Sequence, residues 1–98
     1  MSVVIIGGNE CMVRRYTDLC WEYRCKAKVY PKMSNGIKNL GTPDLMILFT
    51  NTISHKMVRC ALSEAKENTT VARCHSSSIA ALKGILDEHA GGAACQKN

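Results

Sequence analysis

The sequence predicts a small α/β domain, a doubly wound three-layer sandwich whose four parallel strands lie in the order 2-1-3-4. Two apolar runs, residues 2–6 and residues 44–50, lead to this interpretation because neither alternates as a half-exposed strand does. A helical pattern and then a further strand-like segment follow each run. Right-handed crossovers place strands connected in this way in one parallel sheet, with helices on both faces.

The predicted first strand, residues 2–6, runs directly into the glycine pair Gly7 and Gly8. Residues 10–24 then carry apolar side chains at helical spacing, which predicts an amphipathic helix. Trp21 falls outside the main apolar stripe of this helix. Two interpretations stay open for it: contact with a partner subunit, or packing beneath the chain's own tail.

The middle of the chain contains a short strand, a poorly patterned connection and a central strand. Residues 26–30 form the short strand, which ends at Pro31 because proline has no amide to donate. Residues 32–43 carry turn signals around one possible helical turn. The continuous apolar run of residues 44–50 predicts a strand that is buried on both faces.

A second helix follows this central strand. Thr52 or Ser54 can cap its start, and its apolar side chains follow the 3.6-residue period up to residues 67–68. Residues 70–73 contain two β-branched side chains among polar ones, which predicts a weak strand at the edge of the sheet.

The last helix begins after the serine triplet of residues 76–78, a strong capping signal, and stops at residues 90–92. We therefore expect a single domain over residues 1–90 and a flexible tail over residues 91–98.

The chain has a formal net charge of +5, and most of the excess lies in its first half. Residues 1–43 hold seven Lys and Arg against three Asp and Glu. A basic first helix could contact nucleic acid, although a solvated surface explains the same charge. The chain shows no signal peptide and no apolar run long enough for a membrane span, so we expect a cytoplasmic protein with no membrane partner.

The chain contains six cysteines, which we expect to be reduced thiols because a cytoplasmic α/β domain needs no disulfide framework. Cys11 lies at a helix start close to two arginines, which favours its thiolate. Cys20 and Cys25 could form a reversible disulfide or could be plain core residues. No metal-binding spacing is present, so no metal is expected. The candidate redox cysteines are Cys11, Cys20, Cys25, Cys60 and Cys74; Cys95 lies in the tail.

The predicted topology brings polar residues together outside the carboxyl ends of the strands, where doubly wound domains bind ligands. Three helix starts, small hydroxyls, two histidines and two cations converge there, which suits a small molecule or an anion. Simple helix capping is the alternative explanation of the hydroxyls. The candidate ligand-binding residues are Gly7, Gly8, Asn9, Thr50, Asn51, Thr52, Ser54, His55, Arg73, His75, Ser76, Ser77 and Ser78.

Specific cofactor and catalytic motifs are missing. The glycine pair lacks the third glycine of a dinucleotide fingerprint, and the second strand ends without an acid that could bind ribose. The chain contains no phosphate-binding loop of the G-x-x-x-x-G-K type and no assignable base–nucleophile pair. We therefore expect no cofactor and assign no catalytic residue.

Four segments resemble domain-of-unknown-function family 2325, a family of small bacterial domains: residues 2–8, 25–30, 43–61 and 75–78, the last followed by Ala81 and Leu82. The resemblance implies a compact Rossmann-like domain without established catalytic residues. Asn9 stands where the family usually has histidine, so a role of that histidine does not carry over. Cys74 stands where serine is more usual.

These observations favour a non-catalytic binding or sensing domain, expected to be a homodimer. It would respond to redox state, or to a small molecule such as oxygen, through its thiols and the crevice. One alternative is a binder of a phosphate-bearing ligand or nucleotide at that crevice. A nucleic-acid module that uses the basic first helix is the other.

Overall fold

The computed structural model describes residues 2–32, 41, 43–65 and 67–89 of the 98-residue chain. All strands of this part of the chain are parallel and pair in the order β2-β1-β3-β4, which confirms the predicted fold class and strand order. The strands are β1 (Ser2–Ile6), β2 (Lys26–Tyr30), β3 (Leu45–Phe49) and β4 (Thr70–Cys74).

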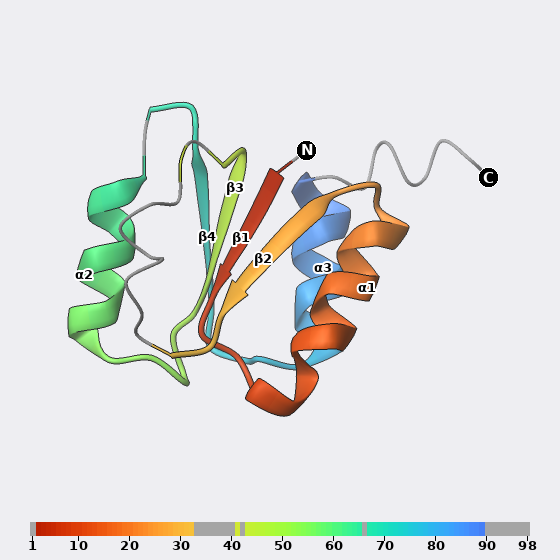
Figure 1. Ribbon diagram of the computed structural model, residues 1–98, viewed down its shortest axis with the longest axis horizontal. Coiled ribbons are helices and arrows are strands. Elements are labelled where there is room, and N and C mark those ends of the chain that lie inside the picture. The colour runs from red at the N-terminus through yellow and green to blue at the C-terminus, as the bar shows by residue number, and fades with distance from the viewer. Residues whose placement is uncertain (1, 33–40, 42, 66, 90–98) are drawn as a thin grey trace.

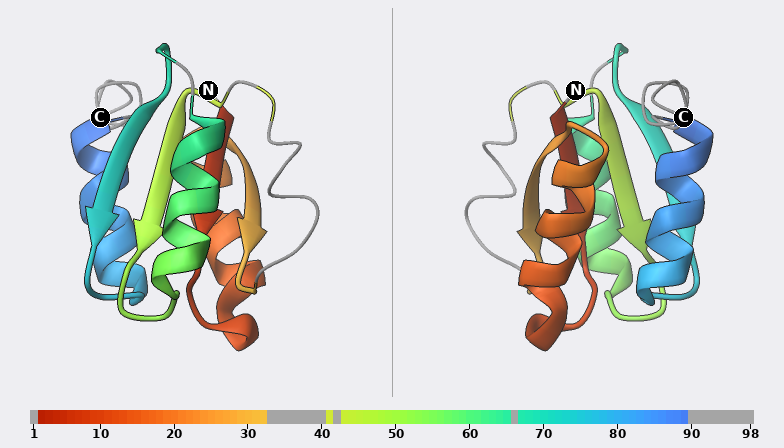
Figure 2. Two further views of the ribbon diagram at one scale, coloured as in Figure 1. Left: turned by 90° about the vertical axis from the view of Figure 1, so that its left-hand side faces the viewer. Right: turned by 90° about the vertical axis from the view of Figure 1, so that its right-hand side faces the viewer.

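Helices cover both faces of the sheet. Figures 1 and 2 show α1 and α3 side by side on one face and α2 alone on the other. The described helical elements are η1 (Glu10–Met12), a 3₁₀ turn, followed by α1 (Val13–Glu22), α2 (His55–Glu64) and α3 (Ile79–His89).

Three predicted helix boundaries differ from the structure. The first helix begins as the 3₁₀ turn η1, where Asn9 is the N-cap and its Oδ1 accepts from the amide of Cys11 at 2.9 Å. Its α-helical part ends at Glu22, before the predicted residue 24. The second helix ends at Glu64, before the predicted residues 67–68. The backbone becomes extended at Ala65, whose amide donates to the carbonyl of Leu62 at 3.1 Å.

The alternating side chains of β1 and β3 enter two separate apolar layers, because successive residues of a strand point to opposite faces. Val3 and Ile5 face α1 and α3, where Tyr16 and Leu82 are fully buried. On the other face, Val4 and Ile6 pack in a smaller cluster with residues of β3 and α2, including Met46, Leu48, Met57 and Ala61. The continuous apolar runs in the sequence therefore reflect burial on both sides.

A Schellman motif ends α1 and directs the chain into β2. The amide of Cys25 donates to the carbonyl of Cys20, and that of Arg24 to the carbonyl of Trp21, both at 2.8 Å. Arg24 is the residue in the left-handed conformation, with φ of +60°, where glycine is usual. In this motif the two residues at the positions of Cys20 and Cys25 make an apolar contact. Both side chains are buried, so their spacing has a structural explanation.

Some expectations fall on residues that the structure does not describe. These are the helical turn expected within residues 32–43, the tail of residues 91–98, and Cys95. None of the described helices is both long and apolar enough to cross a membrane.

Candidate functional site at the carboxyl edge of the sheet

Three loops meet at the edge of the sheet where β1, β3 and β4 end and where η1, α2 and α3 begin (Figure 1). We call residues 7–9 the first loop, residues 50–54 the second loop and residues 75–78 the third loop. All ligand-binding candidates from the sequence lie in these loops or next to them. The predicted convergence is therefore present, and what each residue does there depends on its contacts.

The glycine pair allows the first and second loops to touch. Gly7 and Gly8 have φ of +96° and +92°, a region that other residues rarely adopt. A Cβ on Gly7 would lie 2.6 Å from Cγ2 of Ile53, and one on Gly8 would lie 2.8 Å from Cε2 of Tyr16. Their amides are engaged too: Gly7 donates to the carbonyl of Tyr30 at 2.8 Å and Gly8 to a threonine hydroxyl. The pair serves the packing of the chain on itself.

Thr52 joins the first and second loops. Its hydroxyl accepts from the amide of Gly8 at 2.7 Å and donates to the carbonyl of Phe49 at 3.0 Å. Together with Ile53, it occupies the space between the ends of β1 and β3. Doubly wound domains bind ligands at this switch point, and here Thr52 and Ile53 lie directly against Gly7.

Tyr16 joins the first and third loops from below. Its ring is fully buried against Phe49, with ring centroids 5.5 Å apart. Its hydroxyl accepts from the amide of Asn9 at 3.1 Å and donates to the carbonyl of Ser77 at 2.6 Å. The apolar pattern of residues 10–24 predicts only a core position for Tyr16. A tyrosine on a buried helix face is itself a signal for such a contact, because a buried tyrosine hydroxyl requires a polar partner.

Thr50 joins the second and third loops. Its amide donates to the carbonyl of Cys74 at 2.8 Å, and its hydroxyl lies 3.0 Å from Nδ1 of His75. The imidazole of His75 is exposed, and no hydrogen bond within the described residues uses its Nε2. The hydroxyls of Thr52, Tyr16 and Thr50 thus connect the three loops. The hydroxyl of Thr50 also holds the ring of His75 at Nδ1.

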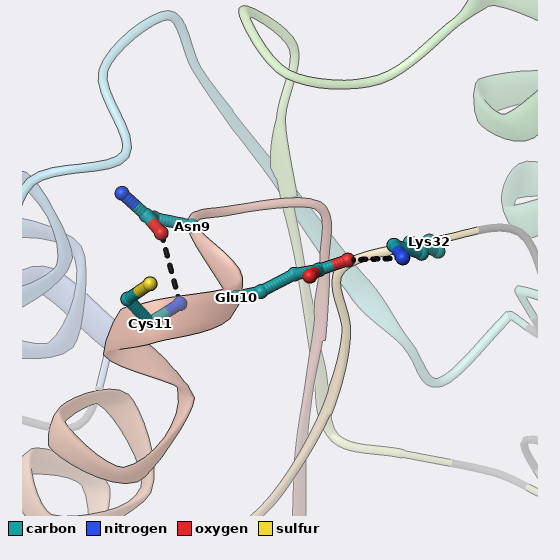
Figure 3. Close-up of polar contacts among 4 residues, drawn as sticks. All are labelled: Asn9, Glu10, Cys11 and Lys32. Atoms are coloured by element: carbon teal, nitrogen blue, oxygen red, sulfur yellow. Dashed lines mark hydrogen bonds and ion pairs between the residues drawn. The ribbon is translucent and has the colours of Figure 1, made fainter.

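Other candidates from the sequence act as helix caps. Ser54 Oγ accepts from the amide of Met57 at 3.2 Å, and Ser78 Oγ accepts from the amide of Ala81 at 3.1 Å. Ser76 Oγ donates to Ser78 Oγ at 3.1 Å, within the third loop. Figure 3 shows the corresponding bond from the amide of Cys11 to Asn9.

Among the exposed side chains of the second and third loops and their neighbours, the charged ones are basic. Asn51, His55, Lys56, Arg73 and His75 are exposed and belong to the second and third loops or adjoin them. Neither residues 50–56 nor residues 73–81 include an acidic residue. The acid of the first loop's helix, Glu10, forms an ion pair of 2.8 Å with Lys32 (Figure 3). The edge formed by the second and third loops is therefore electropositive, and the positive ends of α2 and α3 add to it.

The described cysteines fall into two groups and none is in a disulfide. Cys20 and Cys25 are buried in the core. Burial, together with the nearby Cys25, raises the pKa of Cys20 to about 12, and burial raises that of Cys25 as well. Cys11 is exposed, while Cys60 and Cys74 are half-buried. Only this second group is open to reagents.

Metal binding finds no support in the part of the chain that the structure describes, where no group of three or more His, Cys, Asp or Glu could hold an ion.

The fold and this edge define a class: a small doubly wound α/β domain, whose loops at the carboxyl edge bind one another through hydroxyl groups. The chain belongs to the family described as uncharacterized protein conserved in bacteria (DUF2325), whose sequence model matches residues 2–89. No curated protein and no solved structure gives a significant match. The family's description names no activity, ligand or partner.

Proposed function

We propose that this domain is a cytoplasmic, non-catalytic binding domain that takes a small phosphate- or carboxylate-bearing molecule at the carboxyl edge. The ligand would bind on the outer side of the second and third loops, because Thr52 and Ile53 lie against Gly7 between the ends of β1 and β3. Binding there would place the anion near the starts of α2 and α3, whose first amides have no partner within their helices.

The observation that carries this proposal is the pairing of Thr50 with His75 between two loops that contain no acid. The contact at Nδ1 holds the ring in one orientation and leaves Nε2 for an outside partner. Arg73 lies near the end of β4, two residues before His75. Its guanidinium is exposed and can bind two oxygens of a phosphate or carboxylate. Such fixed groups lower the cost of ordering side chains on binding.

The proposal is tested by titrating the protein with inorganic phosphate, a sugar phosphate and a nucleotide, while recording amide chemical shifts and the unfolding temperature. We expect saturable shifts in residues of the second and third loops, and a stabilisation of about 2.7 kcal/mol at a ligand concentration near 100 times Kd. Arg73→Ala and His75→Ala should each weaken binding about tenfold.

Lys28→Ala is the matched control. Lys28 is an exposed cation on β2, the outer strand farthest from β4, so its loss should leave the affinity unchanged. Two results would reject the proposal: no saturable shift at millimolar concentrations of any of the three ligands, or equal loss of affinity in the Lys28 control and the two loop variants.

A second candidate is a response to redox state or oxygen through the thiols at the same edge. It is favoured by the exposure of Cys11 in η1 and the partial exposure of Cys74 at the end of β4. Mass spectrometry after treatment with oxidised glutathione or hydrogen peroxide should find modification at these residues before Cys20 and Cys25. Unchanged masses at Cys11 and Cys74 after such treatment would dismiss this candidate.

A further inference from the structure

The outer surface of α1 carries an exposed tryptophan. Among the described residues, Trp21 is the one large apolar side chain that is exposed, with 62% of its surface accessible. It is also the only tryptophan of the chain. Arg14, Asp18 and Trp21 are four and three residues apart, so they share one face of the helix. That face lies opposite the buried Tyr16 and Cys20.

An open groove of about 360 Å³ runs beside this face, between α1 and α3. Figure 2 shows the two helices next to each other on this side of the molecule. The groove is lined by Arg15, Asp18, Leu19, Glu22 and Ile79. Charged walls with apolar residues between them are typical of a surface that a helix or a loop of another chain can contact.

The charges along α1 are arranged with opposite signs at its two ends. Arg14 and Arg15 lie near its start, whereas Asp18 and Glu22 lie further along. None of these four side chains forms an ion pair within the described part of the chain. The face therefore carries as many acids as bases, which suits a nucleic acid poorly.

A two-fold axis would make this surface complementary to itself. Most homodimers use such an axis, so that the same patch contacts itself in the opposite direction. In an antiparallel pair of α1 helices centred between Thr17 and Asp18, Arg14 of one copy lies beside Trp21 and Glu22 of the other. The guanidinium can then stack on the indole and pair with the carboxylate, and both contacts occur twice.

We propose that the outer face of α1 is a homodimer interface, in which two copies pair antiparallel through Arg14, Trp21 and Glu22. Trp21 is the apolar anchor in each half of the interface, and the arginine and glutamate determine the direction of pairing. The face lies away from the edge formed by the second and third loops, so the dimer does not depend on the proposed anion site.

Sedimentation velocity over a range of protein concentrations tests the proposal, with the emission of Trp21 recorded on the same samples. We expect a concentration-dependent dimer, and an emission maximum that moves to shorter wavelength as dimer forms because the indole loses water. Trp21→Ala should raise the dimer Kd by at least about tenfold. Circular dichroism should show an unchanged fold, because the side chain is exposed.

A charge exchange makes the test specific. Arg14→Glu places two carboxylates together at each end of the pair, and Glu22→Arg places two cations there, so each variant alone should be mainly monomeric. An equimolar mixture of the two variants restores both pairings, and we expect heterodimers with nearly the affinity of the original protein. Arg59→Glu, on α2 across the sheet, is the control and should leave dimerisation unchanged.

Three outcomes would overturn the proposal. The first is a chain that stays monomeric at the highest soluble concentration. The second is a dimer whose Kd is the same in Trp21→Ala and in both charge variants. The third is an emission maximum already at short wavelength in the monomer, which would mean that another part of the same chain covers Trp21.

Discussion

The hydroxyl of Tyr16 donates a 2.6 Å hydrogen bond to the carbonyl oxygen of Ser77, which lies 61 residues further along the chain. This bond attaches α1 to the loop before α3, and the same hydroxyl also accepts from the amide of Asn9. One side chain from the core thus positions two loops of the candidate site. Loss of this hydroxyl should therefore affect both stability and the site.

We expect Tyr16→Phe to lower the free energy of unfolding by about 1–3 kcal/mol, because it leaves an amide and a carbonyl at the site without their partner. Urea denaturation measures the change. Tyr30→Phe is the matched control: Tyr30 is half-buried, its hydroxyl forms no hydrogen bond within the described residues, and we expect a change below about 0.5 kcal/mol. Equal effects of both substitutions would contradict this role of Tyr16.

The two glycine environments predict opposite effects of the same substitution. Gly8→Ala combines a φ of +92° with a Cβ placed 2.8 Å from the ring of Tyr16, so we expect a loss of about 2 kcal/mol or more. Gly84 lies in α3 and a Cβ there has no neighbour within 4 Å. Gly84→Ala should therefore stabilise the protein by up to about 1 kcal/mol. Thermal unfolding of both variants measures these changes, and destabilisation by Gly84→Ala would contradict the open surroundings of this glycine.

The left-handed conformation of Arg24 offers a stabilising substitution. Arginine at a φ of +60° is strained relative to glycine, so Arg24→Gly should raise the free energy of unfolding by about 1 kcal/mol. Arg24→Ala keeps the Cβ and should have almost no effect, since the arginine side chain is exposed. If both variants lose stability, the side chain of Arg24 contributes more than the strain of its backbone.

The buried thiol of Cys20 predicts a loss of stability in alkali. Its pKa is raised by burial and by Cys25 from the ordinary value of 9.0 to about 12, so the folded protein keeps a proton that the unfolded chain releases. The resulting stabilisation is complete below pH 9 and is lost as the pH rises towards 12. We expect the free energy of unfolding to fall over this range, and to fall less steeply in Cys20→Ala. Parallel pH profiles of the two proteins would exclude this thiol as the cause.

Much of the fold can be read from hydrophobic patterning. The unbroken apolar runs of β1 and β3 indicate strands buried on both faces, and alternation of strands with helices then permits few topologies. Burial of Cys20 and Cys25 was one of two interpretations of their spacing. The Schellman motif between α1 and β2 explains why these residues are apolar and close together.

The candidate site was harder to predict because hydrogen-bond partners are far apart in the sequence. The glycine pair and Thr52 were expected at a ligand, yet they contact each other across 44 residues. Tyr16 was expected only in the core, yet its hydroxyl joins two loops. Local patterns say that a polar group occurs at a strand end, and they do not say which other group it meets.

The sequence by itself determined the class of fold, the strand order and the edge of the sheet where polar residues gather, because these follow from the period of apolar residues and from the handedness of crossovers. Only the tertiary structure decided which of those residues bind other parts of the chain and which stay exposed. Gly7, Gly8, Thr52 and Tyr16 are used within the chain, while His55, Arg73 and His75 remain exposed. The reason is physical: a hydrogen bond forms between groups that lie within about 3 Å of each other, and folding alone sets the distances between loops.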